Sequence, residues 1–339
     1  MANTDPVNDD PSVTQYILDR ASKDSPARIR PIAAATRGLR GEVMTEMMAL
    51  RGAGAVAFSD DGATIMNAAV MRRVLEYSRM ADAPVIVHAE DCHLRGGGVV
   101  NEGPISTRLG LPGNPAAAEE IMVARDIRLA RLTGAHLHIA HVSTAGAADL
   151  IRKAKDAGLR VTAEVAPHHL TLTDEATQRF DTSTRVAPPL RSRDDVDALR
   201  QALAEEVIDM IATDHAPHAT YEKEVEFTEA PPGMIGLETA VAVCLELVRE
   251  GVLSPLEFVR RLSTNPARLL GVEGGGLRPG DPGDVVIVDP TREWTYDPSQ
   301  GFSKSRNSPW AGERLTGRVV ATVVAGRLVY HHERGVLIR

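Results

Sequence analysis

A carboxylate and two imidazoles follow a short apolar stretch within the sequence VIDMIATDHAPH, residues 207–218. The apolar stretch that ends at Ile211 is typical of a buried strand, and Asp214, His215 and His218 come directly after it. In a parallel α/β barrel the carboxyl ends of the strands carry the chemistry, so these side chains are candidates for metal binding or acid–base catalysis. At a single strand end the alternative is structural: the carboxylate caps the next helix, and the histidines lie in a solvated loop.

Three earlier apolar stretches end in the same way. AGAVAF leads into Asp61, PVIV into His88 and LHIA into His141. A single polar residue at a strand end is usually a structural hydrogen-bonding group, but four metal-ligand types at four strand ends are harder to explain in that way. Because such strand ends converge on one pocket of a barrel, these three residues and Asp214 predict a site for a divalent cation. Imidazole and carboxylate ligands without thiolate suit zinc, manganese or cobalt, and availability favours zinc.

The composition is that of an ordinary globular protein. The 339 residues are 43% hydrophobic and 25% charged, which allows one large barrel or two smaller domains. A formal net charge of −8 argues against a general nucleic-acid-binding or anionic-membrane surface. Only two cysteines occur, the N-terminal segment is polar, and no apolar run reaches the length of about 18 residues that a spanning helix needs. We therefore expect a cytoplasmic protein that binds neither membranes nor nucleic acids.

Strand-like stretches alternate with longer helical patterns along most of the chain, which predicts βαβ units and a parallel sheet, hence an α/β fold. The pattern changes near residue 272. After it, residues 283–288 and 318–330 are strand-like, and a Gly-Arg turn splits the second stretch. We therefore expect a barrel over residues 1–272 and a small β subdomain over residues 273–339. The expected strands of the barrel are 29–35, 53–58, 84–87, 137–140, 160–165 and 207–211, and the expected helices are 66–81, 114–133, 147–157, 194–206, 236–250 and 255–262.

Several motifs follow one another along the chain: MANTDPVND, AFSDDG, VHAED, HIAHVSTAGA, TAEVAPHHLTLTDE, VAPPLR, IATDHAPH and GMIGLETA. In this order they resemble the motifs of bacterial class I dihydroorotases in the amidohydrolase superfamily, and the match covers nearly the whole chain. The resemblance implies a TIM-type (β/α)8 metal-dependent hydrolase barrel and, in the C-terminal region, part of a small β-sandwich. It also implies dihydroorotase activity, the reversible zinc-dependent cyclisation of N-carbamoyl-L-aspartate to L-dihydroorotate in de novo pyrimidine (UMP) biosynthesis.

The resemblance implies a role for each of the four strand-end residues. Asp61 would bridge two zinc ions, and His88 and His141 would bind the second of them. Asp214 would bind the first zinc ion and act as the general acid and base of the reaction. Asp60 is the alternative to Asp61 as the bridging carboxylate, and the motif favours Asp61.

Four further residues match substrate-contacting positions of the family. Asn3 and His218 match residues that hold the substrate carboxylate, and Pro232 and Gly233 match a loop that contacts the substrate. Ala187 stands where the family usually has an asparagine, and a methyl group cannot donate the corresponding hydrogen bond. We therefore expect a weaker hold on dihydroorotate, or a different substrate.

The family pattern begins before the first residue of this chain. In the family a first strand ends in His-x-His followed by an arginine; the histidines bind the first zinc ion, and the arginine binds the substrate carboxylate. No such motif precedes Asn3, and the His-Leu-His triplet at residues 136–138 lies inside the strand expected before His141. We therefore expect the first strand and most of the second to be missing, one zinc site to be incomplete, and residues 1–339 alone to show little activity.

Three functions stay open on the sequence alone. The first is dihydroorotase, with a translation start assigned too far downstream. The second is a catalytically impaired dihydroorotase-like subunit that scaffolds aspartate carbamoyltransferase. Such subunits normally lack some of the metal ligands at separate positions along the chain, whereas Asp61, His88, His141 and Asp214 are all present here. The third is another cyclic amidohydrolase of the hydantoinase or allantoinase type, but those enzymes generally carry a carboxylated lysine at the bridging position, and no lysine falls at an expected strand end. The expected partners are a small-molecule substrate, a second copy in a homodimer, and aspartate carbamoyltransferase.

Overall fold

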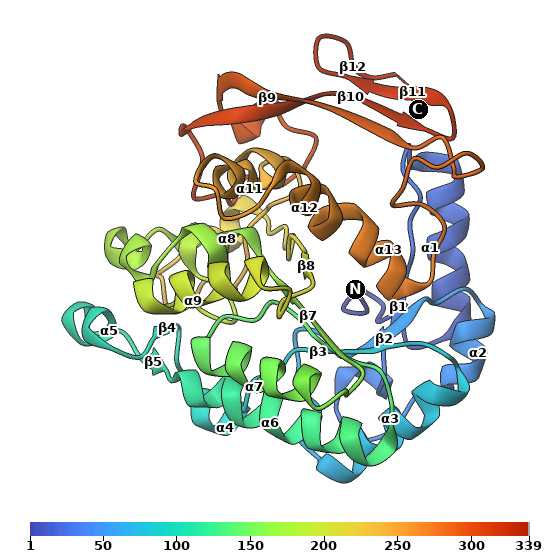
Figure 1. Cartoon of the computed structure of the whole chain (residues 1–339). Coiled ribbons are helices and arrows are strands. Elements are labelled where there is room, and N and C mark those ends of the chain that lie inside the picture. The colour runs from blue at the N-terminus through green and yellow to red at the C-terminus, as the bar shows by residue number, and fades with distance from the viewer. Residues whose placement is uncertain (338–339) are drawn as a thin grey trace.

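Six parallel strands form the central sheet of the protein, whose computed structural model describes residues 1–337 (Figure 1). The strand order is β1-β2-β3-β6-β7-β8, so the strands lie in the sheet in the order in which they occur along the chain. Ile86 is the register partner of His138, and Val165 is the partner of Ile211, both in parallel pairs. The strands are β1 (Ile32–Ala33), β2 (Ala57–Ser59), β3 (Val85–Val87), β6 (Leu137–Ile139), β7 (Val161–Val165) and β8 (Met210–Ile211).

Helices cover the outer face of this sheet and contact one another in chain order (Figure 1). The main ones are α3 (Ala68–Met80), α6 (Ala116–Thr133), α7 (Ala145–Asp156) and α9 (Arg193–Ala204). Their starts are encoded locally, because Asn67, Thr144 and Ser192 each accept a hydrogen bond from a backbone N–H group of the first turn of α3, α7 and α9. The other helices are α1 (Pro11–Asp24), α2 (Met47–Gly52), α4 (Cys92–Arg95), α5 (Pro104–Leu109), α8 (Pro167–Thr171), α10 (Thr220–Lys223), α11 (Ala240–Arg249), α12 (Pro255–Val259) and α13 (Asn265–Leu270), with 3₁₀-helices η1 (Arg37–Leu39), η2 (Asp174–Arg179), η3 (Thr182–Thr184) and η5 (Pro298–Gln300) and the π-helix η4 (Arg260–Thr264).

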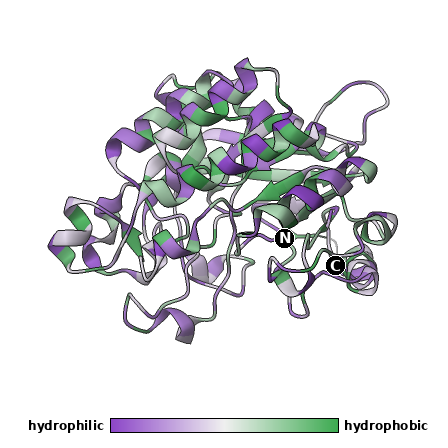
Figure 2. Cartoon of the chain, turned by 90° about the horizontal axis from the view of Figure 1, so that it is seen from below, coloured by the Kyte–Doolittle hydropathy of each residue, from purple (hydrophilic) through white to green (hydrophobic). Residues whose placement is uncertain are grey.

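The main hydrophobic core lies between the sheet and these helices. Every residue of β2, β3 and β6 is buried, which is typical of parallel strands covered by helices. In Figure 2 the central strands have the colour of hydrophobic residues, whereas the surrounding helices carry hydrophilic residues on part of their surface. Large buried members of the core are Phe58, Met71, Leu75, Leu137, Ile139 and Ile151.

A second, antiparallel sheet follows the barrel segment and lies against α11 (Figure 1). Its order is β12-β11-β10-β9, with β9 (Val285–Thr295), β10 (Arg314–Val324), β11 (Arg327–His331) and β12 (Gly335–Val336). Gly317 of β10 lies close to Leu245 of α11, and the indole of Trp294 donates a hydrogen bond of 2.9 Å to the Gly317 carbonyl. This sheet therefore packs against the helix layer through α11.

The alternation of strands and helices, the parallel sheet and the separate C-terminal sheet agree with the sequence prediction, but several boundaries differ. The helix expected from residue 114 begins at Ala116, because Asn114 pairs with Asn101 in a small parallel sheet of β4 (Val100–Asn101) and β5 (Gly113–Asn114). The helix expected over residues 255–262 continues through α12, η4 and α13 to Leu270. The division at residue 272 falls between α13 and β9 and stays a prediction.

The helix α1 was not predicted from the sequence. The buried residue of this helix is Thr14, so α1 lacks the wide apolar stripe by which surface helices are recognised. Across the part of the chain that the structure describes, none of the helices combines the length and the apolar character needed to cross a bilayer.

The contact between β10 and α11 can be tested at Gly317, which has a φ of +96° and whose added β-carbon would clash with Leu245 Cδ1. We expect Gly317→Ala to lower the free energy of unfolding by about 1–3 kcal/mol, because it adds backbone strain and a clash. Gly312→Ala is the matched control, since Gly312 also has a positive φ, of +80°, but no atom within 4 Å of the added carbon. Equal urea midpoints for the two variants would show that Gly317 does not hold β10 against α11.

Candidate metal centre and catalytic site

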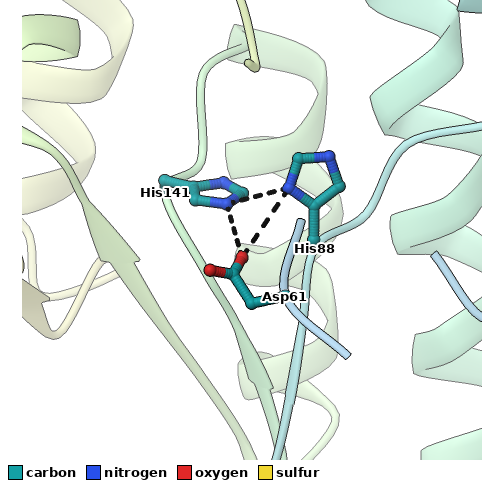
Figure 3. Close-up of side chains that lie close together, drawn as sticks. All are labelled: Asp61, His88 and His141. Atoms are coloured by element: carbon teal, nitrogen blue, oxygen red, sulfur yellow. Dashed lines mark hydrogen bonds and ion pairs between the residues drawn. The ribbon is translucent and has the colours of Figure 1, made fainter. Parts of the chain in front are cut away.

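Three of the expected ligands meet at the carboxyl ends of neighbouring strands. Asp61 follows β2, His88 follows β3 and His141 follows β6, and all three side chains are buried. His88 Nδ1 lies 3.1 Å from His141 Nε2, and Asp61 Oδ1 lies 3.3 Å from His141 Nε2 and 3.8 Å from His88 Nδ1 (Figure 3). One ligand atom from each residue therefore falls within 4.8 Å of the others.

Two of the strand-end residues have a strained backbone. His141 has a φ of 34° and Asp214 a φ of 47°, values that residues with a β-carbon rarely adopt. Each stands just after its strand, β6 and β8 respectively, where the chain changes direction. Such strain is concentrated at functional sites, because the surrounding structure must hold it in place.

Charge holds the three residues together. Burial alone would raise the pKa of Asp61, but the hydrogen bond and charge of His141 and the charge of His88 lower it to about 2. Burial alone would lower the pKa of His141, but its hydrogen bond to Asp61 and the charges of Asp214 and Asp61 raise it to about 10. The carboxylate and the imidazoles thus compensate one another in a place where a single charge would be unfavourable.

The donor set fits a divalent cation. Asp61, His88 and His141 offer one carboxylate oxygen and two imidazole nitrogens, all aimed at a common point (Figure 3). Catalytic zinc is typically held by three such protein ligands and keeps a further position open for water or substrate. The cluster is therefore a candidate metal centre, and zinc remains the metal expected from the ligand types.

The structure separates Asp61 from its neighbour Asp60. The Asp60 carboxylate accepts hydrogen bonds from the backbone N–H groups of Ala35 (2.9 Å) and Thr36 (2.8 Å) and from the Thr36 hydroxyl. These bonds tie the end of β2 to the segment after β1, and burial raises the pKa of Asp60 in spite of them. Asp60 is committed to the backbone, which leaves Asp61 as the carboxylate that faces the histidines.

Asp214 lies beside the cluster and outside the group of three ligand atoms. It is half-buried, and burial raises its pKa; the charges of Asp61 and Glu164 act in the same direction, whereas the charge of His141 opposes them. A carboxyl group with a raised pKa next to a metal site is suited to accepting and returning a proton. The expected acid–base role of Asp214 and its expected role as a ligand both stay predictions.

The expected substrate residues fall into two places. A β-carbon on Gly62 would lie 3.5 Å from Asn3 Nδ2, so Asn3 is next to the turn that carries Asp61. His218 lies against the other loop: its Nε2 is 3.0 Å from the Pro232 carbonyl oxygen, and a β-carbon on Gly233 would approach that nitrogen to 3.0 Å.

Ala187 belongs to the segment that supports this second loop. The Gly233 N–H donates to the carbonyl of Arg185, two residues before Ala187, with a distance of 2.7 Å. Ala187 is half-buried there and brings only a methyl group. Because alanine has no polar side-chain atom, Ala187 cannot make the hydrogen bond that an asparagine would make here.

Asn307 is a site residue that sequence reasoning missed. Its Nδ2 donates to the carbonyls of Ala216 (2.9 Å) and Gly233 (3.1 Å), and its Oδ1 accepts from the His218 N–H (3.3 Å). Its own carbonyl accepts from the Ile235 N–H at 2.9 Å, and the residue is 5% exposed. One side chain therefore joins the loop after β8 to the loop around Gly233. The sequence carries no signal for this, because Asn307 is 74 to 91 residues away from its partners.

Comparison with known proteins decides the family. The profile of the amidohydrolase family matches residues 9–329. The chain belongs to the amidohydrolase family. Within it, the chain is 51% identical to a protein of Syntrophus aciditrophicus named dihydroorotase, over 98% of this chain and 78% of that one. A protein of the same name from Pelotomaculum thermopropionicum is 55% identical over 97% of this chain and 77% of its own length. The resemblance to dihydroorotases is thereby confirmed.

Solved structures of amidohydrolases have the same fold. The L-hydantoinase (dihydropyrimidinase) of Arthrobacter aurescens superposes with a TM-score of 0.89 at 24% identity, over 100% of this chain and 78% of that one. The dihydropyrimidinase of Brevibacillus agri superposes with a TM-score of 0.73 at 25% identity, over 85% of this chain and 67% of that one. These likenesses confirm the expected TIM-type barrel of metal-dependent hydrolases.

The assignment of the two neighbouring carboxylates can be tested with a pair of variants. Asp61→Asn should lower Zn²⁺ affinity by more than about 100-fold. Substituting a residue that only hydrogen-bonds to a metal ligand already lowers metal affinity by about 10–100-fold, and Asp61 is itself an expected ligand. Asp60→Asn should leave Zn²⁺ affinity unchanged but lower the free energy of unfolding by about 1–3 kcal/mol, since its bonds to the segment after β1 are disturbed. Equilibrium dialysis and urea unfolding measure the two effects. The reverse pattern would assign the metal to Asp60.

The link through Asn307 predicts a loss of stability. Asn307→Ala leaves the carbonyl of Ala216 and the buried carbonyl of Gly233 without this donor, and we expect the free energy of unfolding to fall by about 1–3 kcal/mol. Gln300→Ala, at an exposed position of the same C-terminal region, should stay within about 0.5 kcal/mol of the parent protein. An Asn307→Ala protein that unfolds at the parent urea concentration would mean that other contacts hold the two loops.

Proposed function

We propose that the protein is a dihydroorotase, a hydrolase that acts on a cyclic amide and interconverts L-dihydroorotate and N-carbamoyl-L-aspartate. The observation that carries the proposal is the convergence of Asp61, His88 and His141 in a chain about half identical to dihydroorotases over 98% of its length. A zinc ion held by these residues would polarise the amide carbonyl and lower the pKa of water. Side chains of this protein would transfer the proton and bind the substrate carboxylate.

Asp214 moves the proton. In ring opening, water adds to the amide carbon and the bond from this carbon to the ring nitrogen breaks. Asp214 accepts a proton from the water and returns it to the nitrogen as it leaves; ring closure uses the same steps in reverse. Its half-buried position and the raised pKa described above suit a group that must exist in both protonation states.

Asn3 and His218 bind the carboxylate of the substrate. Asn3 lies near the turn of Asp61, and His218 lies on the loop after β8. Both side chains can donate a hydrogen bond, which a carboxylate accepts. Pro232 and Gly233 lie next to His218, and the lack of a side chain on Gly233 lets Ala216 and His218 approach this loop closely.

The residue at the position expected to bridge the two zinc ions favours dihydroorotate over hydantoins as the substrate. Hydantoinases generally use a carboxylated lysine there, and the corresponding residue is Asp61, which contacts both histidines. The most buried lysine, Lys223, instead donates to the carbonyls of Pro231 (2.6 Å) and Thr182 (3.1 Å). The structural likeness to hydantoinases concerns the fold, whereas the sequence relatives at about 50% identity are named dihydroorotase.

Further features of the proposal rest on the family resemblance. They are a place in pyrimidine biosynthesis, zinc as the metal, a homodimer, and aspartate carbamoyltransferase as a partner. A cytoplasmic location is supported by the two cysteines, Cys92 and Cys244, which are both unpaired.

The assay is hydrolysis of L-dihydroorotate by this chain and by a version built to the full length of the Syntrophus aciditrophicus relative, of which the chain spans 78%. We expect the full-length version to hydrolyse dihydroorotate. In that version Asp214→Asn should lower kcat by at least about 10²–10⁴-fold, because the general acid and base is removed.

Zinc content serves as the control in this assay. The Asp214→Asn protein should keep the metal held by Asp61, His88 and His141, so that lost activity reflects lost proton transfer. Near-normal kcat in this variant would remove Asp214 from the mechanism. Faster hydrolysis of hydantoin than of dihydroorotate by the parent protein would overturn the proposed substrate.

A further inference from the structure

His88 presents its two ring nitrogens to different neighbours. Its Nδ1 faces Asp61 and His141, while the other ring nitrogen points away from them (Figure 3). On that far side Nε2 lies 3.5 Å from Glu90 Oε2. A histidine ligand binds metal through the nitrogen that carries no proton, so whatever accepts the proton of the other nitrogen decides which one is free.

Glu90 is itself held in place. The residue is 4% exposed, and its Oε1 accepts a hydrogen bond of 2.7 Å from Asn114 Nδ2. The guanidinium of Arg95 lies 3.5 Å from Oε2, the same oxygen that faces His88. The Glu90 carboxylate is therefore fixed by contacts at both of its oxygens.

The contacts continue to the second imidazole ligand through Arg191. This residue is 2% exposed; its Nη1 donates to the Asn114 carbonyl (2.8 Å) and its Nε to the Ser143 hydroxyl (3.0 Å). Ser143 follows His141 by two residues, and its N–H donates to the buried Glu119 at 2.9 Å. Buried polar groups linked in this way restrict one another, because each would lose a partner if its neighbour moved.

We propose that Glu90 is a positioning residue that holds the ring of His88 with Nδ1 toward the metal. Asn114 and Arg95 hold Glu90, and Arg191 in turn holds Asn114. The inference rests on the proposed function only in assuming that Asp61, His88 and His141 bind a metal ion. A carboxylate on the far nitrogen of a ligating histidine fixes the tautomer and the orientation of the ring and makes it a better donor. Glu90 lies on the side of the ring opposite the three ligand atoms, so it acts through His88 and not as a ligand.

The experiment measures metal affinity, which does not depend on turnover. Zn²⁺ and Co²⁺ are titrated into the metal-free parent protein, Glu90→Gln and Asp126→Asn, with a chelating dye as competitor. Asp126 is a matched control, since it is a buried carboxylate, 1% exposed, that pairs with Arg125 instead of a histidine. We expect Glu90→Gln to weaken binding by about 10–100-fold and to change the visible spectrum of bound Co²⁺, while Asp126→Asn keeps the parent affinity.

The outcomes separate this inference from the proposed function. A parent protein that binds neither ion would overturn both. Parent-like affinity and spectrum in Glu90→Gln would overturn the positioning role and leave the metal site intact. Should Glu90→Gln fail to fold, Asn114→Ala, which frees Glu90 without removing it, should still weaken binding; unchanged affinity in that variant would contradict the proposal.

Discussion

The compensation of buried charge at the carboxyl ends of β2, β3 and β6 is the constraint on which the rest of the site depends. Asp61 and His141 lie where water is largely excluded, and an isolated charge there would be strongly unfavourable. Their mutual contacts lower the pKa of the acid to about 2 and raise that of the imidazole to about 10. A divalent cation bound by the same atoms would displace the proton of His141 and supply the positive charge opposite Asp61 in its place.

The parallel sheet explains how residues far apart in sequence reach this arrangement. Asp61 and His141 are separated by 80 residues but follow strands that lie one strand apart in the sheet, with β3 and its His88 between them. The layer around the ligands is built differently, from loops and from side chains that bond to groups far away in the sequence: Asn114 donates to the Glu90 carboxylate and Asn307 to the Ala216 carbonyl. The strands bring the ligands together, and these polar side chains then orient them and the neighbouring loops.

Much of this could be predicted from the sequence, because it depends on local patterns. The apolar stretch before His88 or His141 indicates a strand, and the rule that strand ends share one edge places their side chains together. The choice of Asp61 over Asp60 followed from the family motif alone; the physical reason, the bonds from Asp60 to the backbone of residues 35 and 36, needs the structure. The long-range partners of Asn307 and Glu90 depend on tertiary packing and leave no periodic signal, and α1 was missed because it buries little apolar surface.

The central claim, that Asp61, His88 and His141 form one metal site, is tested most directly by locating zinc in a crystal with anomalous X-ray scattering. The account predicts a zinc peak bonded to an Asp61 carboxylate oxygen, to Nδ1 of His88 and to Nε2 of His141, the atoms that face one another in the structure. Zinc bound through Nε2 of His88, or a peak elsewhere with none at these three residues, would contradict it.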